Sequence, residues 1–303
     1  MSKMSKMFQE ELKEYVHCNP QLVKMKPCGE NMYILKYTKK VFYKGLWNKY
    51  LEHCRGTIVD EDFNIIAYPF TKIYNYGIET DCPVFDENEL IEACRKVNGF
   101  MATITWHNND LLISTTGSVD SDHTQYIRDM IDIEKYSYFC KSNPRLSLMF
   151  ECVHPQDPHI IQEEFGMHLI GYRKKTWHSN ILNASSIEIA RCLDCFHEDC
   201  RLMLLSELVT LAKTVEHEGF VFYNSDGVSA KIKSPHYLAK KYVTRNPNTS
   251  KLLTQQAKEI VDEEYYPLID NIRYNIDHFT SLSEQQRLLW VTNFLRNDNA
   301  TYS

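Results

Sequence analysis

The stretch "RKVNGF" (Arg95–Phe100) contains a lysine, Lys96, that is followed two and three positions later by Asn98 and Gly99. This K-x-N-G tetrapeptide is weak evidence by itself, because average residue usage produces one by chance in roughly one chain in twenty of this length. Lys96 is therefore either a catalytic nucleophile or an ordinary surface lysine. The rest of the sequence has to distinguish these two possibilities.

The composition is that of an ordinary globular protein. Of the 303 residues, 43% are hydrophobic and 24% are charged, which allows one large domain or two unequal ones. The net charge of −6 excludes a histone-like polycation, so any nucleic acid must be contacted by a local patch. No apolar run approaches the roughly 20 residues that a membrane span needs, and we expect no membrane association.

The N-terminus and the cysteines favour a cytoplasmic location. The first residues, "MSKMSKMFQEELKEY", lack the apolar region of a secretory signal. The ten cysteines stand at irregular positions, which is typical of reduced thiols rather than of a disulfide framework. We therefore expect a cytoplasmic protein whose cysteines are reduced.

Periodicity predicts an antiparallel α+β domain over 1–243 and a small all-α domain over 244–303. Residues 146–153 have the pattern of a buried strand, and Asp226-Gly227 supplies left-handed turn residues for the clearest hairpin. The hairpins are expected over 55–69, 100–117 and 219–234. The helices are expected over 8–17, 85–96, 123–140, 185–193, 204–215, 249–279 and 281–297.

Charged side chains gather near several of these strands. Lys231 and Lys233 are two positions apart in a strand, so both side chains point to one face. Two cations on a buried face are costly without an anionic partner. The pair therefore indicates either a bound phosphate or a strand face that is open to water.

Two carboxylates complete this group of charges. Glu151 follows the apolar run 148–150, and Glu218 stands at the start of another strand. Two carboxylates that face two lysines would form a site for a divalent cation and a polyphosphate. A lysine beside such cations would have its pKa lowered and would be nucleophilic near neutral pH, which is the state that we expect for Lys96.

The order of these pieces resembles the motif series of the covalent nucleotidyltransferases, which include RNA ligases, DNA ligases and mRNA capping enzymes. The pieces are "KVNG" at 96–99, "FECV" at 150–153, "HEGFVF" at 217–222 and "AKIKS" at 230–234. The sequence is most similar to the RNA ligase 1 family of tailed phages, the tRNA-repair type. "CRG" at 54–56, "KIYN" at 72–75 and "KIKSPHY" at 231–237 carry that closer resemblance, which covers roughly residues 50–243.

The resemblance implies a fold and a reaction. The fold is the ligase adenylation domain, in which antiparallel sheets flanked by helices hold ATP between them. Lys96 would attack the α-phosphate of ATP to give a lysyl-adenylate and pyrophosphate. AMP would then pass to a 5′-phosphate RNA end, and a 3′-hydroxyl would displace it to seal the strand. Each step is an in-line displacement at phosphorus, which depends on positioning and charge neutralisation.

The resemblance also assigns roles to the other motif residues. Lys231 and Lys233 would hold the α-phosphate and stabilise its developing charge. Glu218 and Glu151 would serve the ribose hydroxyls and a Mg²⁺ or Mn²⁺ ion, with Glu218 the stronger metal ligand.

Further expected contacts to ATP or to the RNA end come from flanking residues. Arg55 and Lys72 would contact phosphates, and Gly99 would let the backbone turn closely beside the nucleophile. Asn98 is expected among the nucleotide-binding residues. Tyr237 matches the tyrosine that follows the last motif, and it is either a nucleotide contact or a packing aromatic.

Two positions depart from the family pattern. Asn98 stands where these ligases usually have aspartate, which keeps hydrogen-bonding capacity but removes a negative charge. Thr116, in "STTGS" at 114–118, stands where the phage enzymes have a lysine. These departures are the only support for a second hypothesis, a catalytically degenerate nucleotidyltransferase fold that binds RNA or nucleotide.

A third hypothesis is a DNA ligase or capping enzyme, but the tail is expected to be helical, unlike the OB-fold that those enzymes carry. An RNA ligase acts on 5′-phosphate and 3′-hydroxyl ends, so its functional partner would be an end-healing polynucleotide kinase and phosphatase.

Two further segments admit functional interpretations. "CLDCFHEDC" (192–200) resembles a zinc site, but its ligands are closer together than in usual structural sites and no second pair follows. The segment 36–50 ("KYTKKVFYKGLWNKY") interleaves cations with aromatics. It is either a stacking surface for nucleic acid or a β-rich segment whose aromatics lie in the core.

Overall fold

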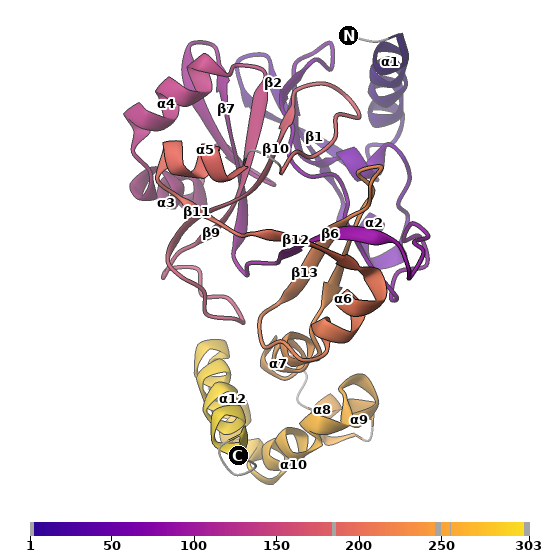
Figure 1. Ribbon diagram of the computed structural model, residues 1–303, viewed down its shortest axis with the longest axis vertical. Helices are drawn as coiled ribbons and strands as arrows, with labels where there is room; N and C mark the ends of the chain where they lie inside the picture. Colours follow the sequence, from indigo (N-terminus) through magenta and orange to yellow (C-terminus); the bar gives the residue numbers. More distant parts are fainter. Residues whose placement is uncertain (1–2, 184–185, 246–249, 255, 300–303) are drawn as a thin grey trace.

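The computed structural model describes residues 3–183, 186–245, 250–254 and 256–299. Figure 1 shows a large body of sheets and helices, with a group of helices below it that ends at the C-terminus. The described strands form three sheets, all of them in the large body. No helix among the described residues is long and apolar enough to cross a membrane.

The N-terminal sheet has the order β1-β2-β3-β4 and is antiparallel throughout. Helix α1 (Lys3–Cys18) packs against this sheet, with Phe8 and Leu12 in the shared core. Its strands are β1 (Val23–Gly29), β2 (Met32–Tyr37), β3 (Arg55–Val59) and β4 (Ile65–Ala67). The helix predicted over 8–17 and the hairpin predicted over 55–69 are both confirmed.

The second sheet has the order β11-β10-β9-β7-β8. Strand β9 is its most buried element, with six of its eight residues buried, which confirms the strand predicted over 146–153. The strands are β7 (Phe100–His107), β8 (Asp110–Thr115), β9 (Leu146–Val153), β10 (Gly166–Lys174) and β11 (Phe196–His197). Helices α3 (Asp122–Met130), α4 (Ile133–Ser142) and α5 (Ser186–Leu193) contribute to its core.

The third sheet has the order β12-β6-β13-β14-β5, and helix α6 (Leu205–Ala212) packs on it. Its strands are β5 (Tyr74–Asn75), β6 (Leu90–Arg95), β12 (Cys200–Leu204), β13 (Gly219–Tyr223) and β14 (Ser229–Lys233). The hairpin predicted over 219–234 is confirmed as β13 and β14. Gly227 has the left-handed backbone (φ +77°) that the turn requires, whereas Asp226 is not among the residues with positive φ.

The helix predicted over 85–96 is wrong, because this segment forms a turn followed by strand β6. Ile91 and Ala93 are buried at a spacing of two, and the strand pairs with both β12 and β13. The acidic residues that suggested the first turn of a helix belong to the preceding turn, in which Glu89 N donates to Asp86 O. Pairing with strands distant in sequence therefore overrode the local helix signal.

The helical segment predicted over 123–140 forms two helices, α3 and α4. The backbone is extended at Ile131, and the Asp132 side chain accepts from Lys135 N as the N-cap of α4. The β-rich interpretation of 36–50 is wrong for its middle part, which forms helix α2 (Lys39–Lys44) and is followed by the short 3₁₀ helix η1 (Leu51–His53).

The aromatics of the 36–50 segment divide between surface and core. On α2, Phe42 and Tyr43 are exposed, at 55% and 78%. Trp47 and Tyr50 instead pack against the core of the N-terminal sheet. A stacking surface for nucleic acid at Phe42 and Tyr43 stays a prediction. Trp47 and Tyr50 belong to the packed core.

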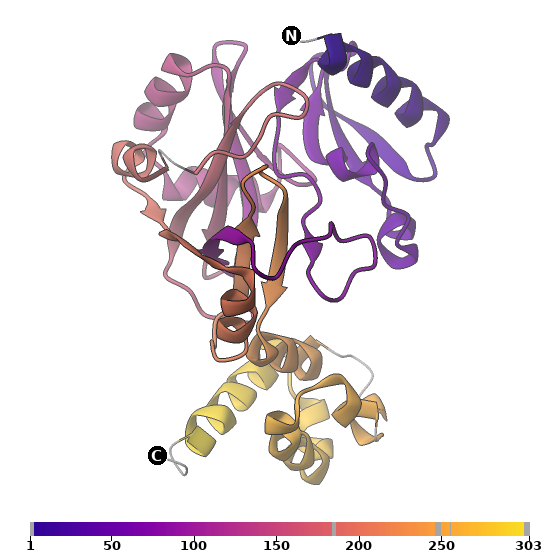
Figure 2. The ribbon, with the colours of Figure 1, turned by 45° about the vertical axis from the view of Figure 1, so that its right-hand side comes forward.

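Helix α7 (Pro235–Arg245) follows β14 directly and leads into the C-terminal helices (Figure 2). The described residues beyond α7 are all helix or connecting turn, as predicted. Their elements are α8 (Ser250–Leu253), α9 (Gln256–Ile260), η2 (Glu263–Tyr265), α10 (Tyr266–Tyr274), α11 (Ile276–Ser281) and α12 (Glu284–Asn299). Val243 on α7 shares a core with Ile269 and Phe279, so α7 runs across the domain boundary that the sequence predicts between 243 and 244. That boundary stays a prediction.

Candidate active site

Lys96 follows β6 at the point where this strand meets β13. Its backbone N–H donates to Gly219 O, which extends the strand pairing by one residue and places Lys96 next to Glu218. Lys96 Nζ lies 3.0 Å from Glu218 Oε2 and 3.9 Å from Glu151 Oε1. The nucleophile candidate and both predicted metal ligands are therefore in one place, although they come from three different segments.

Glu218 lies between two lysines. Its other carboxylate oxygen, Oε1, is 3.1 Å from Lys233 Nζ, and only 3% of the Glu218 side chain is exposed. Burial would raise the pKa of Glu218, but the charges of Lys96 and Lys233 hold it below its ordinary value. Lys233 also lies over the ring of Tyr237, 4.6 Å from its centroid, and Tyr237 is buried on α7.

The expected low pKa of Lys96 supposes a bound cation, and the protein side chains by themselves have the opposite effect. Burial would lower the pKa of Lys96, but Glu151 and Glu218 outweigh burial and raise it above the ordinary lysine value. The prediction of a lowered pKa depends on a divalent cation at the carboxylates, and it stays a prediction. Lys96 is therefore a protonated, ion-paired lysine until those carboxylates acquire another partner.

Asn98 is buried and connects two parts of the site. Its amide Nδ2 donates to Glu218 Oε2 at 2.7 Å, and its Oδ1 accepts from Ile161 N at 2.9 Å. Asn98 thus ties Glu218 to the segment between β9 and β10. An amide can donate to a carboxylate, whereas the aspartate usual at this position cannot when it is ionised.

Replacement of Asn98 by aspartate is expected to destabilise the protein most at neutral pH. Asn98→Asp would face Glu218 with a second carboxylate, so at least one of the two carboxyl pKa values would rise in the folded state. A carboxyl group whose pKa is higher in the folded than in the unfolded state lowers the free energy of unfolding as pH rises above its unfolded-state pKa. The variant should therefore lose about 1–3 kcal/mol of stability at pH 7 and less at pH 5. Urea unfolding of wild type and variant at both pH values measures this, and an equal loss at both would contradict it.

Gly99 lies where strand β9 approaches most closely. A Cβ at this position would be 2.3 Å from Cys152 O, so the chain has no room for a side chain. Gly99 N also donates to Glu151 Oε1 at 3.0 Å. The glycine therefore allows the backbone beside Lys96 to position Glu151.

A cavity of about 220 Å³ opens beside Lys96 and is lined by polar and apolar groups. Its charged lining includes Arg55, Lys231 and Glu151, and Thr116 also faces it. Apolar side chains, among them Phe70 and Val221, cover other parts of the wall. A cavity with an apolar part and convergent cations fits a nucleotide, with its base in the apolar part and its phosphates among the cations.

Lys231 is the residue that most requires an anion. Burial first, and then the charges of Arg55, Lys233, Lys72 and Lys96, lower its pKa to about 7. Among the described residues Lys231 forms no ion pair. A phosphate group would relieve the mutual repulsion of these cations, so the residues present fit ATP.

Binding of ATP is expected to weaken as pH rises above about 7. The wild-type Lys231 loses its charge in the free protein around this pH, whereas a bound polyphosphate favours the charged form. Lys231→Arg stays charged over this range, so its affinity for ATP should change less with pH. Because ATP titrates equally with both proteins, the difference between their profiles reports Lys231. Calorimetric titration of both proteins between about pH 6 and about pH 9, a range that spans the Lys231 pKa, tests this. Parallel profiles would be the contrary result.

Lys72 and Arg55 differ in how they are held. Lys72 forms an ion pair with Glu79 and lies over the rings of Trp47 and Tyr74, so it is near the cation group but does not line the cavity. Arg55, at the start of β3, lines the cavity and donates to Thr71 O at 2.9 Å. Arg55 therefore lines the nucleotide-sized cavity, whereas Lys72 lies near the other cations but outside the cavity lining.

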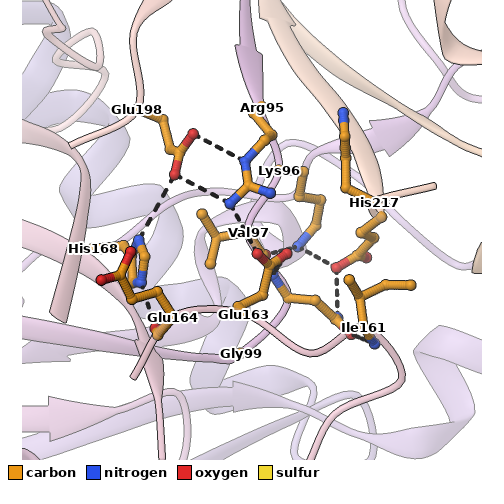
Figure 3. A network of polar contacts seen from close by, with 12 residues as sticks. Arg95, Lys96, Val97, Gly99, Ile161, Glu163, Glu164, His168, Glu198 and His217 are labelled. Carbon is orange, nitrogen blue, oxygen red and sulfur yellow. Dashed lines mark hydrogen bonds and ion pairs between the residues drawn. The ribbon is translucent and has the colours of Figure 1, made fainter. Parts of the chain in front are cut away.

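A polar network beside Lys96 was missed by sequence reasoning (Figure 3). Arg95 Nη2 donates to Glu163 Oε2 at 2.8 Å, and its Nε donates to Glu198 Oε2 at 3.0 Å. His168, whose Nδ1 lies 3.8 Å from Glu198 Oε1, and Arg95 together outweigh burial and lower the pKa of Glu198 to about 2. The only sequence signal for Arg95 was its position next to Lys96, and Glu163 and Glu198 carried none.

The cysteine-rich segment 192–200 contributes to the cavity wall, and it does not form a metal site. Among the described residues no group of three or more His, Cys, Asp or Glu side chains is arranged to hold a metal ion. Cys200 is joined to Cys94 by a disulfide, because antiparallel pairing of β12 with β6 places these residues opposite each other. The expectation of reduced cysteines is therefore wrong for this pair, while the other eight are free thiols.

The carboxylates fit a divalent cation only in combination with other ligands. Glu151 and Glu218 are the two acidic side chains that reach Lys96, and both already accept from nitrogen donors. Mg²⁺ commonly takes one or two protein carboxylates and fills its remaining positions with water and phosphate oxygens. A cation held jointly with a nucleotide phosphate is compatible with this donor set.

The fold is shared with solved structures of ligases. An Aquifex aeolicus protein assigned as an ATP-dependent DNA ligase superposes with a TM-score of 0.57 at 15% identity, over 93% of this chain and 75% of the other. Two forms of an archaeal ATP-dependent RNA ligase give TM-scores of 0.56 at 14% and 15% identity, over 95% of this chain and 78% of theirs. No protein-family model matches the chain, and no curated protein matches it.

These similarities establish the class of fold. The chain has the α+β nucleotidyltransferase fold of ATP-dependent ligases, with antiparallel and mixed sheets flanked by helices and with helices at its C-terminus, as the sequence predicts. At identities near 15% the similarity concerns the fold, and the reaction must be argued from the site.

Proposed function

We propose that this protein is an ATP-dependent RNA ligase that works through a covalent lysyl-AMP on Lys96. The observation that carries the proposal is the arrangement around this lysine. Lys96 Nζ contacts Glu218 at 3.0 Å, and it lines the same cavity as Lys231 and Arg55. A primary amine, cations for phosphate and carboxylates for a metal are the groups that nucleotidyl transfer to lysine requires.

In the proposed first step, Lys96 Nζ forms a bond to the α-phosphorus of ATP while the bond to pyrophosphate breaks. Lys96 must first lose a proton, which its carboxylate neighbours oppose. A divalent cation bound by Glu218 and Glu151 would neutralise these carboxylates and lower the pKa of Lys96. Lys231 and Lys233 would stabilise the charge that develops on the phosphate oxygens.

In the later steps AMP passes to the 5′-phosphate of an RNA end, and a 3′-hydroxyl displaces AMP to form the phosphodiester. The motif order supports a tRNA-repair enzyme similar to the RNA ligase 1 family of tailed phages, acting in a cytoplasm after an end-healing kinase and phosphatase. The motif resemblance supports RNA as the substrate, and the described residues after α7 form helices. We further propose that residues 1–243 and 244–303 act as adenylation domain and accessory domain.

Incubation with α-labelled ATP and Mg²⁺ tests the proposal. The wild-type protein should acquire label that is lost in acid, as expected of a phosphoramidate, and should release the label on addition of RNA with a 5′-phosphate. Sealing assays with matched RNA and DNA strands then identify the substrate. A wild-type protein that acquires no label would instead be the degenerate nucleotide-binding fold.

A further inference from the structure

A second cleft lies below the nucleotide-sized cavity, between the body and the C-terminal helices. Its volume is about 550 Å³, larger than that of the cavity beside Lys96. The segment 155–163, between β9 and β10, forms one wall, and α7 and α12 form the other. In Figure 1 this segment descends from the sheets toward α12. None of the residues to which the resemblance assigns a role lines this cleft, although His217 and His236 from the motif stretches do.

The cleft reaches the reaction centre through Arg95. Arg95 lines both the cleft and the cavity that contains Lys96. Ile161, on the cleft wall, donates its N–H to Asn98, and Asn98 donates to Glu218. A molecule bound in the cleft would therefore lie against the segment that holds the groups around Lys96.

Cations are concentrated on the C-terminal side of the cleft. Lys240 on α7 is only 7% exposed, and among the described residues it forms no ion pair at contact distance. Burial lowers the pKa of Lys240; Glu216 opposes this effect and Arg296 adds to it. Arg296 on α12 is exposed and lines the same cleft. His236 also lines the cleft, and burial together with Lys240 lowers its pKa to about 4.

The balance of charge in the cleft is opposite to that of the whole protein. The chain has a net charge of −6. Of the two acidic residues of the cleft wall, Glu163 is already paired with Arg95, and Glu216 faces Lys240. Lys240 and Arg296 thus add positive charge beside apolar side chains, which include Leu288, Leu289 and Ile160. Cations beside apolar surface are what a single-stranded nucleic acid requires, for phosphates and bases respectively.

We propose that this cleft binds the phosphodiester backbone of the RNA strand whose end is joined at Lys96. This inference rests on the proposed function and adds to it a location for the substrate strand. Lys240 and Arg296 contact phosphates, and the apolar wall of α12 contacts bases. A protein partner is the less suitable occupant, because Lys240 and Arg296 lie beside apolar side chains, an arrangement that suits phosphates and bases.

Anisotropy of a short fluorescent RNA with a 5′-phosphate tests this proposal on the full chain. The double variant Lys240→Gln/Arg296→Gln should bind RNA about 10-fold more weakly than wild type at about 0.1 M salt. The slope of log K against log salt should fall by about 1.4, because two phosphate contacts are lost. The matched control is Arg128→Gln/Lys141→Gln, which makes the same charge change on α3 and α4 and should bind RNA within about twofold of wild type.

Two additions keep the result unambiguous. Arg296→Gln alone changes an exposed side chain and should also weaken RNA binding. Lys240→Arg keeps the positive charge and should bind RNA nearly as tightly as wild type. Labelling by α-labelled ATP is measured separately on wild type. A wild-type protein that acquires no label would refute the proposed function, whereas the RNA affinities decide the cleft proposal. Equal RNA affinity of the double variant and its control would overturn the cleft proposal. Equal affinity of wild type for RNA and for DNA of the same sequence would show that the cleft contacts the phosphates, as proposed, and not the ribose hydroxyl groups.

Discussion

Replacement of Lys96 by arginine is expected to reduce labelling of the protein by α-labelled ATP by at least about 1,000-fold, to background. Arginine keeps the positive charge and can still pair with Glu218, which is 3.0 Å from the lysine amine. Its guanidinium is not deprotonated in proteins and therefore supplies no nucleophile. The variant thus separates the chemistry of the amine from its role as a counter-ion.

The control for Lys96→Arg is the affinity for ATP. Because the Lys231 and Arg55 cations remain in the cavity, ATP should still bind to the variant, within about tenfold of wild type. Thermal unfolding should show a folded protein. Label on Lys96→Arg at the wild-type level would show that another residue is the covalent nucleophile.

Replacement of Glu218 by glutamine is expected to reduce the rate of labelling by about 100- to 1,000-fold, the range seen when one preorganised electrostatic group is removed. Glutamine has nearly the same shape, and its single amide oxygen can still accept from Lys96 and Asn98, whereas its amide nitrogen would face Lys233. It cannot neutralise the two lysines, and it is a poorer metal ligand. The decrease in the rate of labelling therefore measures the effect of the negative charge of Glu218.

The pH profile of Glu218→Gln distinguishes this electrostatic role from general damage. In wild type, Glu218 and Glu151 oppose deprotonation of Lys96 unless a cation neutralises them, so labelling at limiting Mg²⁺ should increase with pH through the alkaline range. Without the Glu218 charge the pKa of Lys96 falls, and the residual activity should reach its plateau at lower pH. An unshifted profile would contradict the assignment.

Glu163→Gln is a matched comparison for Glu218→Gln. Glu163 is a buried carboxylate that is 2.8 Å from Arg95, and no direct contact joins it to Lys96 among the described residues. Both substitutions disturb a buried ion pair, so both should lower stability by up to about 3–5 kcal/mol. Only Glu218→Gln should slow labelling by about 100-fold or more, which corresponds to an increase of about 2.7 kcal/mol in the activation free energy.

Local sequence was sufficient for the elements whose pattern depends on near neighbours. The hairpin of β13 and β14 follows from alternating residues and from Gly227, whose left-handed backbone few other residues adopt. Strand β9 follows from its unbroken apolar run. Strand β6 could not be predicted in this way, because its partners β12 and β13 lie more than a hundred residues away and outweigh local helix preference.

The sequence by itself determined which chemical groups this protein possesses and in what order, which was enough to predict the class of fold and to nominate Lys96. The tertiary structure decided how those groups act on one another. It placed Glu218 and Glu151 at 3.0 and 3.9 Å from Lys96 Nζ, and these two side chains raise the pKa of Lys96. It also gave Asn98 its partners and brought Arg95 between two cavities. These effects depend on distances between segments far apart in the chain, and electrostatic interaction follows distance in space, not separation in sequence.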